Sequence, residues 1–330
     1  MKRVLITGGA GFIGHHVVDY LLERTDWQLV LLDRLDTSGD LNRLTHLPIW
    51  PAQKARVTFV HHDLKAPFND AICARLGSID YIFHLAASTH VDRSISDPML
   101  FVGDNVVGTG HLLEYARTLP ALSLFINFST DEVFGPAPTG VAHSEESPYK
   151  PSNPYAASKA GAASLGYSYF TTYKLPVITT YTMNNFGERQ HPEKLIPRTI
   201  RSVLRGERMP IFAELENGTV KSVGSRFWLH ARNTASALLF LVNAARPGEA
   251  YNVVGFDELT NLEMAQQIAA IIGQPLLYDL VDFHAVRPGH DRRYALDGSK
   301  LKRLGWQPEV DFKSSLEGTV TFALRHPEWA

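Results

Sequence analysis

The sequence predicts an α/β fold, a doubly wound parallel sheet with a smaller α/β domain beside it. Three observations lead to this prediction. Short apolar runs typical of buried strands alternate with amphipathic helical segments in the N-terminal part of the chain. A glycine-rich turn joins the first of these strands to the first helix. The chain has 330 residues, of which 45% are hydrophobic, enough for one large domain or two smaller ones.

Bulk composition narrows the class of protein. The formal net charge is −2, so no global basic field favours nucleic acid or a membrane surface, and neither partner is expected. Cys73 is the only cysteine, which rules out an intrachain disulfide and fits a reducing, cytoplasmic location. No apolar run is long enough to span a membrane. The sequence also shows no His/Asp/Glu cluster that demands a metal, so none is expected.

The first strand, turn and helix carry a nucleotide-binding signal. The segment RVLITGGAGFIGHHVVDYLLE (3–23) is predicted to be a strand, then a glycine turn, then an amphipathic helix. Gly8 allows a tight turn, and Gly11 and Gly14 complete a G-x-x-G-x-x-G spacing. A position without Cβ lets a pyrophosphate approach the backbone, and the helix N-terminus favours the anion. The strand and helix context makes this pattern informative, because glycine spacing alone is weak.

The second strand indicates which dinucleotide binds. The segment WQLVLLDRLD (27–36) carries Asp33 about 20 residues after the turn, where a carboxylate can accept a hydrogen bond from the ribose 2′-hydroxyl. Arg34 follows it, and a guanidinium there can accommodate a 2′-phosphate. Because Asp33 repels that phosphate, the sequence favours NAD over NADP.

Later elements continue the alternation. The segments 57–63, 79–87 and 122–129 are predicted strands, and NVVGTGHLLEYAR (105–117) is a predicted helix. Ligands of such sheets bind at the carboxyl ends of the strands. Asp63 is therefore a candidate contact to adenine, and the residues 129–132 fall at another strand end.

Two adjacent acids follow the strand that ends at residue 129, in the stretch INFSTDEVFG (126–135). One interpretation is a helix capping box formed by Ser129 and Glu132. The residues VFGPAP (133–138) stop a helix almost at once, which makes capping the weaker interpretation. The position at a strand end favours a catalytic pair, Asp131 and Glu132.

A tyrosine and a lysine follow in SNPYAASKAGAASLGYSYF (152–170). Tyr155 and Lys159 are four residues apart, so a helix places both side chains on one face. We expect the lysine cation to lower the pKa of the phenol, so that Tyr155 can act as a base near neutral pH. Tyr-x-x-x-Lys is common by itself, but after a dinucleotide-binding segment it is a strong signal.

Six motifs together resemble a known family: TGGAGFIG (7–14), THVDRSISDP (89–98), STDEVFG (129–135), NPYAASKA (153–160), HPEKLIP (191–197) and RPGHDRRYALD (287–297). With them the chain resembles the extended short-chain dehydrogenases, and within these the nucleotide-sugar 4,6-dehydratases of the dTDP-glucose type. The resemblance spans nearly the whole chain. It implies a Rossmann fold, bound NAD, a nucleotide-diphosphate sugar as substrate, and an NAD-dependent lyase activity.

The resemblance also implies roles for individual residues. Thr130, Tyr155 and Lys159 form the site that oxidises C4 of the sugar. Glu132, ionised, then removes the C5 proton, and Asp131, protonated, supplies the proton for the departing 6-hydroxyl. Adjacent carboxyl groups push their pKa values apart, which suits this division. The implied cofactor-binding residues also include Gly8, Gly11, Phe12, Ile13, Gly14, Asp33, Asp63, Leu64, Ala86 and Ala87.

For the substrate, the resemblance implies binding by Thr89, His90, Asn184, Lys194, Leu195, Arg226, Arg287 and His290. Several positions depart from the family pattern. Ser88 stands where the dTDP-type enzymes usually have Glu, Phe134 stands for Tyr, and Phe227 stands for Asp. A UDP-, CDP- or GDP-linked sugar, or an N-acetylated one, therefore stays open beside dTDP-glucose.

Domain organisation and assembly complete the expectations. We expect an NAD-binding domain from 1–183 and 224–250, and a nucleotide-sugar-binding domain from 184–223 and 251–330. The resemblance implies a homodimer in which helices near 104–117 and 154–173 form a four-helix bundle.

Two other functions compete with the dehydratase. Related epimerases and decarboxylases share the fold and the Tyr/Lys pair, but they typically lack an Asp-Glu pair after the threonine. A non-catalytic NAD-binding regulatory protein is disfavoured because Tyr155, Lys159 and both acids are present.

Overall fold

A parallel sheet dominates the computed structural model, which describes residues 1–216, 219–255, 257–282 and 293–329. Within these residues the sheet has seven strands in the order β11-β6-β5-β4-β1-β2-β3, all parallel. The fold therefore confirms the predicted doubly wound sheet. Its strands are β1 (Arg3–Thr7), β2 (Gln28–Asp33), β3 (Val57–His61), β4 (Tyr81–His84), β5 (Leu124–Thr130), β6 (Val177–Thr182) and β11 (Ala250–Val253).

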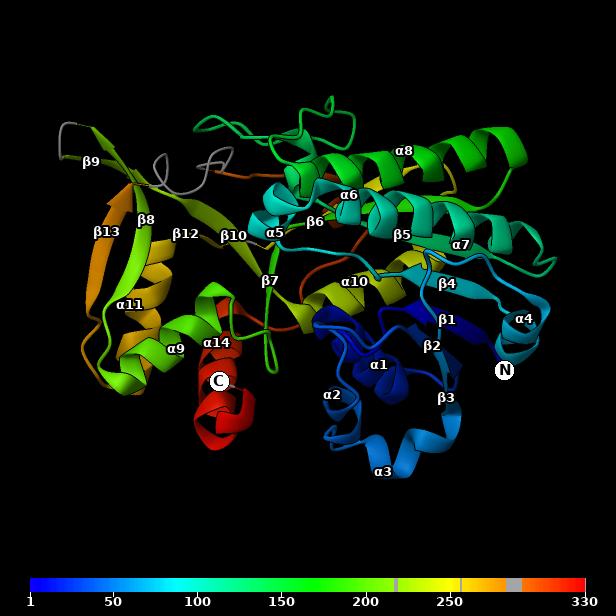
Figure 1. Ribbon diagram of the computed structural model, residues 1–330, viewed down its shortest axis with the longest axis horizontal. Coiled ribbons are helices and arrows are strands. Elements are labelled where there is room, and N and C mark those ends of the chain that lie inside the picture. The colour runs from blue at the N-terminus through cyan, green and yellow to red at the C-terminus, as the bar shows by residue number, and fades with distance from the viewer. Residues whose placement is uncertain (217–218, 256, 283–292, 330) are drawn as a thin grey trace.

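Helices cover both faces of this sheet (Figure 1). Side chains alternate between faces along a strand, so Val4 and Ile6 of β1 join one apolar core while Leu5 joins the other. The first core includes α1 (Phe12–Arg24) and α10 (Ala231–Ala244). The second includes α4 (Asp70–Leu76), α7 (Gly108–Arg117) and α8 (Pro154–Tyr173). Two cores of this kind keep the strands buried on both sides, as a parallel sheet requires.

The strand order reverses at β1, which lies between β2 and β4. Ligands of such folds bind beside this switch point, at the carboxyl ends of the strands. The turn after β1 is built for close approach. Gly8 has a φ of +71°, and a Cβ on Gly14 would lie 2.0 Å from the Gly8 carbonyl oxygen. Only glycine fits at position 14, because the helix begins directly against the turn.

Two smaller sheets form the other side of the molecule (Figure 1). In one, β10 (Ser225–His230) runs parallel to β7 (Asn184–Phe186) and antiparallel to β12 (Asp257–Thr260). In the other, β8 (Met209–Glu216) lies between β13 (Tyr278–Asp282) and β9 (Thr219–Val223). Helices α9 (Leu195–Arg205), α11 (Asn261–Ile272) and α14 (Phe312–Arg325) share an apolar cluster with Trp228 of β10.

The predicted division into two domains stays a prediction. β10 pairs with β7 and β12, α10 packs against α1, and β11 extends the large sheet. The chain thus passes between the large sheet and the smaller sheets more than once.

Shorter elements complete the chain. The predicted helix at 105–117 begins earlier than expected, as a π-helical segment over Val102–Val107 that continues into α7. No helix among the residues that the structure describes has the length and apolarity to cross a membrane. The described residues also form the short α-helices α2 (Asn42–Thr45), α3 (Trp50–Gln53), α5 (Val91–Ser96), α6 (Pro98–Phe101) and α13 (Ser299–Arg303), and short 3-10 helices at Lys54–Arg56 and Pro327–Trp329.

Candidate active site

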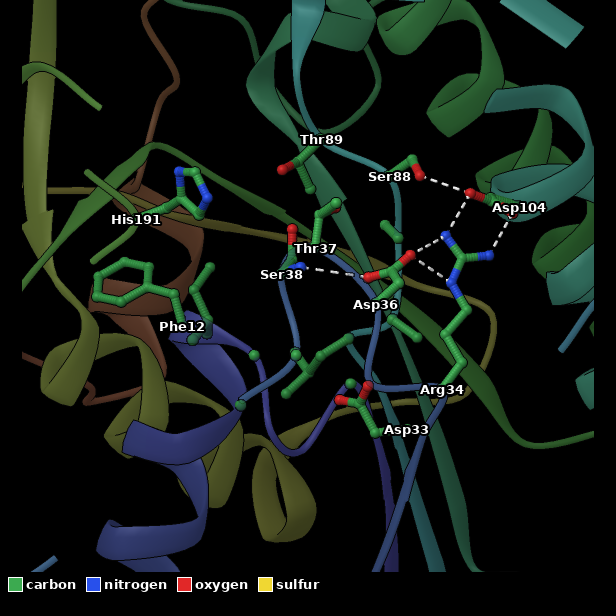
Figure 2. Close-up of a pocket in the computed structure, with 18 of the residues that line it drawn as sticks. Phe12, Asp33, Arg34, Asp36, Thr37, Ser38, Ser88, Thr89, Asp104 and His191 are labelled. Carbon is green, nitrogen blue, oxygen red and sulfur yellow. Dashed lines mark hydrogen bonds and ion pairs between the residues drawn. The ribbon is translucent and has the colours of Figure 1, made fainter. Parts of the chain in front are cut away.

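A cavity opens at the carboxyl edge of the large sheet, beside the switch point (Figure 2). It is bordered by the glycine turn, by the ends of β2, β3 and β4, and by the segment before α9. The predicted cofactor and substrate residues that line it are Gly8, Gly11, Phe12, Ile13, Gly14, Asp33, Asp63, Leu64, Ala86, Ala87, Thr89, His90 and Lys194. One continuous hollow therefore brings together residues spread over the first 194 positions.

Asp33 is held in place by the backbone at the end of β2. Its carboxylate accepts hydrogen bonds from the Ala10 amide (3.0 Å) and the Leu35 amide (2.9 Å). Burial raises its pKa, and these two hydrogen bonds act against that rise. The carboxylate is thus fixed in orientation at the cavity wall, as a hydrogen-bond acceptor for a ribose must be.

Arg34 turns away from Asp33 and toward other carboxylates (Figure 2). Its guanidinium donates two hydrogen bonds to Asp104, of 2.6 and 2.8 Å, and its Nε donates one of 2.6 Å to Asp36. The sequence indicated Arg34 as a possible phosphate ligand, but it did not predict the ion pairs with Asp36 and Asp104.

The acid pair lies at the end of β5, where the strand passes into a 3-10 helix over Asp131–Phe134. Thr130 caps this helix by accepting from the Glu132 amide (3.4 Å), and its hydroxyl also donates to Asp131 Oδ1 (2.9 Å). The helix ends at Gly135, with a φ of +75°. Ser129 Oγ has no hydrogen-bond partner among the described residues, so the capping residue is Thr130 and not Ser129.

Asp131 is a buried carboxyl group, 3% exposed. Burial raises its pKa to about 7, the charge of Glu132 adds to the rise, and the Thr130 hydrogen bond and Arg226 act against it. One of its oxygens, Oδ2, has no hydrogen-bond partner among the described residues. Asp131 is therefore partly protonated near neutral pH, and a general acid needs its protonated form.

Glu132 is held from two directions. Its Oε2 accepts from the Asn153 side chain (3.2 Å) and from the Tyr294 hydroxyl (3.3 Å). Asn153 also caps α8 by accepting from the Ala156 amide (2.9 Å). These two donors fix the orientation of the Glu132 carboxyl group.

Tyr155 and Lys159 lie on α8. Tyr155 contacts Phe101 and Lys159 contacts Phe128, and both phenylalanines line the cavity. The Lys159 ammonium donates to the carbonyl of Phe128 (2.6 Å), and the Tyr155 ring packs edge-on to Phe101. Burial lowers the pKa of Lys159 to about 8. The expectation that Lys159 lowers the pKa of Tyr155 is wrong for this structure, since burial and the charge of Glu132 raise the phenol pKa well above its usual value.

Arg226 lies near the acid pair. It is 6% exposed, its guanidinium stacks over the Tyr294 ring at 4.5 Å, and its charge acts on Asp131. Asn184 begins β7, and Leu195 begins α9 and packs into two apolar clusters. Arg287 and His290 lie outside the residues that the structure describes.

Several side chains of the site were not predicted. Asn153 could have been found from its place before Pro154 at a helix start, a position that favours a capping residue. Tyr294 and Asp104 gave no local signal, because their partners are far away in the sequence. Among the described residues, no group of three or more His, Cys, Asp or Glu side chains is arranged to hold a metal ion.

Comparison with known proteins finds relatives that match nearly the whole chain. The chain is 39% identical to a dTDP-glucose 4,6-dehydratase of Neisseria gonorrhoeae, covering 98% of this chain and 96% of the relative. It is also 39% identical to the low-salt glycan biosynthesis protein Agl12 of Haloferax volcanii, with 98% and 99% covered. A crystal structure of DesIV, a dTDP-glucose 4,6-dehydratase of Streptomyces venezuelae with NAD bound, superposes with a TM-score of 0.87 at 36% identity, covering 99% of this chain and 98% of DesIV.

A family model decides the assignment. The model described as GDP-mannose 4,6 dehydratase matches residues 5–319, which is most of the chain. The protein therefore belongs to the GDP-mannose 4,6 dehydratase family.

Proposed function

We propose that the protein is an NAD-dependent nucleotide-sugar 4,6-dehydratase and that its substrate is dTDP-glucose. The observation that carries this proposal is the acid pair: a buried Asp131 with a pKa near 7 beside a Glu132 held by two hydrogen-bond donors. Such a pair offers one proton donor and one proton acceptor at neutral pH. The relatives named dTDP-glucose 4,6-dehydratase support the choice of substrate.

The cavity fits a dinucleotide. The tight turn at Gly8 and the close packing of Gly14 against it place the start of α1 at the cavity wall, where a helix N-terminus favours a pyrophosphate. Asp33 presents a fixed carboxylate one strand away. We assign the predicted cofactor residues to NAD on this basis. Bound NAD supplies the acceptor and later the donor of a hydride, and its positive charge adds to that of Lys159.

The chain's own groups then handle protons. Tyr155 accepts the proton of the sugar 4-hydroxyl as C4 is oxidised, and Thr130 hydrogen-bonds the oxygen there. The resulting 4-ketone makes the C5 hydrogen acidic. Glu132 takes that proton, and Asp131 gives its own to the 6-hydroxyl, which leaves as water when the C6–O bond breaks. The elimination leaves a C5–C6 double bond, and return of the hydride to C6 together with a proton to C5 gives the 4-keto-6-deoxy sugar.

The phenol needs a cation to do this work, because its pKa is raised in the structure. Lys159 lies one helical turn along α8, and with a pKa of about 8 it is mostly charged at pH 7. We therefore propose that the phenol ionises with NAD bound, when the positive charge of the nicotinamide acts on Tyr155 in addition to the charge of Lys159.

For the substrate, we assign the sugar to Thr89, His90 and Asn184, and the nucleotide diphosphate to Lys194, Leu195, Arg226, Arg287 and His290. Thr89, His90 and Lys194 line the same cavity as the proposed cofactor residues. This shared cavity supports a substrate position next to the cofactor.

We also propose a cytoplasmic homodimer formed by α7 and α8. Apolar side chains are exposed on this surface: Val107, just before α7, is 45% exposed, and Tyr167 and Tyr173 of α8 are 61% and 48% exposed. Pairing this surface with a second copy would remove these groups from water.

The direct test is an assay of the purified protein with a panel of nucleotide sugars. dTDP-glucose should yield a 4-keto-6-deoxy product, detected by mass spectrometry. Tyr155→Phe should keep the fold and the cofactor but lose activity by about 10²-fold or more, since general-base catalysis contributes about 10²–10⁴-fold. An epimer or a decarboxylated product in place of the dehydrated one would instead support the epimerase or decarboxylase alternative.

A further inference from the structure

A guanidinium stands where the cofactor's adenosine is proposed to bind. Arg34 follows directly after Asp33, and both line the cavity together with Asp63. A cation at this place ordinarily attracts a phosphate on the ribose 2′-oxygen, the group that distinguishes NADP from NAD. The neighbours of Arg34 decide whether this cation is available.

Carboxylates engage all three nitrogens of the Arg34 guanidinium (Figure 2). Asp104 accepts from Nη1 at 2.6 Å and from Nη2 at 2.8 Å, a bidentate arrangement. Asp36 accepts from Nε at 2.6 Å, and Asp63 lies 3.6 Å from Nη1. The positive charge is thus neutralised by neighbouring carboxylates other than Asp33.

Asp104 is the firmest of these partners. Its side chain is only 4% exposed, compared with 40% for Asp36. The Ser88 hydroxyl donates to it at 2.6 Å, and the Lys65 ammonium lies 3.3 Å away. Burial would raise its pKa, but the hydrogen bonds from Arg34 and Ser88 lower the pKa below its usual value. Asp104 is therefore an ionised, nearly buried carboxylate fixed by three groups.

We propose that Asp104 determines cofactor choice by holding the Arg34 guanidinium, so that the adenosine end of the cavity accepts a 2′-hydroxyl and rejects a 2′-phosphate. This inference rests on the proposed dependence on NAD. A 2′-phosphate must either share Arg34 with Asp104 and Asp36, against their charges, or displace Asp104. Displacement leaves a nearly buried carboxylate without its main partner, which is strongly unfavourable.

The test uses Asp104→Asn, which keeps the shape and removes the charge. Kd values for NAD and NADP are measured by calorimetry on the full-length protein stripped of bound nucleotide. NADP should bind the variant roughly ten- to a hundredfold more tightly than it binds the parent, the range expected for one charge-assisted hydrogen bond, while NAD changes little. In the double variant with Arg34→Gln this gain should disappear, because the freed guanidinium is its source.

Two further variants provide a control and a second test. Glu193→Gln removes one negative charge from the same cavity wall without touching Arg34, and it should leave the NADP affinity unchanged. Asp36→Asn removes the exposed partner of Arg34 and should give a smaller gain in NADP affinity. This variant replaces Asp104→Asn in the test if Asp104→Asn fails to fold.

An unchanged NADP affinity in Asp104→Asn, or a gain that survives Arg34→Gln, would overturn the inference. If Asp104→Asn does not fold, an unchanged NADP affinity in Asp36→Asn overturns it. A parent protein that binds neither nucleotide would instead overturn the proposed function, so the two failures are distinguishable.

Discussion

Asp131 combines two features that usually exclude each other in one residue, deep burial and a carboxyl group. Burial and the adjacent Glu132 raise its pKa to about 7, so the folded protein keeps a proton that an exposed aspartate loses near pH 4. The arrangement has a cost in stability. Between these two pH values the folded state binds more protons than the unfolded state, so stability falls as pH rises through this window.

Asp131→Asn removes this ionisation and should therefore change the pH dependence of folding. From pH 5 to pH 8 the parent protein should lose more thermal stability than the variant does. The difference in Tm should reach several degrees, because one pKa unit corresponds to about 1.4 kcal/mol. Differential scanning calorimetry at both pH values checks it. Parallel pH profiles for the two proteins would show that Asp131 is ionised in the fold across this range.

At the scale of elements, α8 connects the two halves of the proposed catalytic group. It carries Tyr155 and Lys159, and its capping residue Asn153 also donates to Glu132. The start of one helix thus fixes the distance between the phenol and the acid pair.

Two substitutions can separate the capping role of Asn153 from its contact with Glu132. Asn153→Ala should lose the cap, at a cost of about 1 kcal/mol in stability, and should lower activity as well. Asn153→Ser is the matched control: serine caps helices well, so stability should recover, but its short side chain cannot reach Glu132, so activity should stay low. Urea unfolding and turnover measured on both variants test this. Full activity in Asn153→Ser would show that only the cap matters.

Local elements were predictable from the sequence, and distant contacts were not. The strand, turn and helix from Arg3 to Arg24 follow from residues within one short segment, and so does the placement of Tyr155 and Lys159 on one helix. The Tyr294 contact with Glu132 joins residues 162 positions apart, and the Arg34 contact with Asp104 joins residues 70 apart. No periodicity or spacing encodes such pairs. The raised pKa of Tyr155 was missed for the same reason, because burial depends on the whole fold.

At the scale of the whole molecule, the surface formed by α7 and α8 is the proposed dimer interface. Tyr167→Glu should convert the proposed dimer to a monomer, because a charge would have to be buried against the second copy. Leu204→Glu is the control, since Leu204 is a comparably apolar residue, 41% exposed, on α9. Light scattering gives the molar mass of each protein. A monomeric parent, or a Tyr167→Glu variant that stays dimeric, would contradict this assignment.

Asp131 and Glu132 are proposed to have different roles, and deuterium exchange at C5 of the substrate tests this division most directly. Glu132→Gln cannot remove the C5 proton, so in deuterated buffer it should accumulate reduced cofactor and show little exchange. Asp131→Asn keeps the base but lacks the proton donor, so it should exchange C5 hydrogen while elimination slows by a factor on the order of 10²–10⁴. Identical behaviour of the two variants in both measurements would contradict the division of roles, and full activity in both would contradict the catalytic role of the pair.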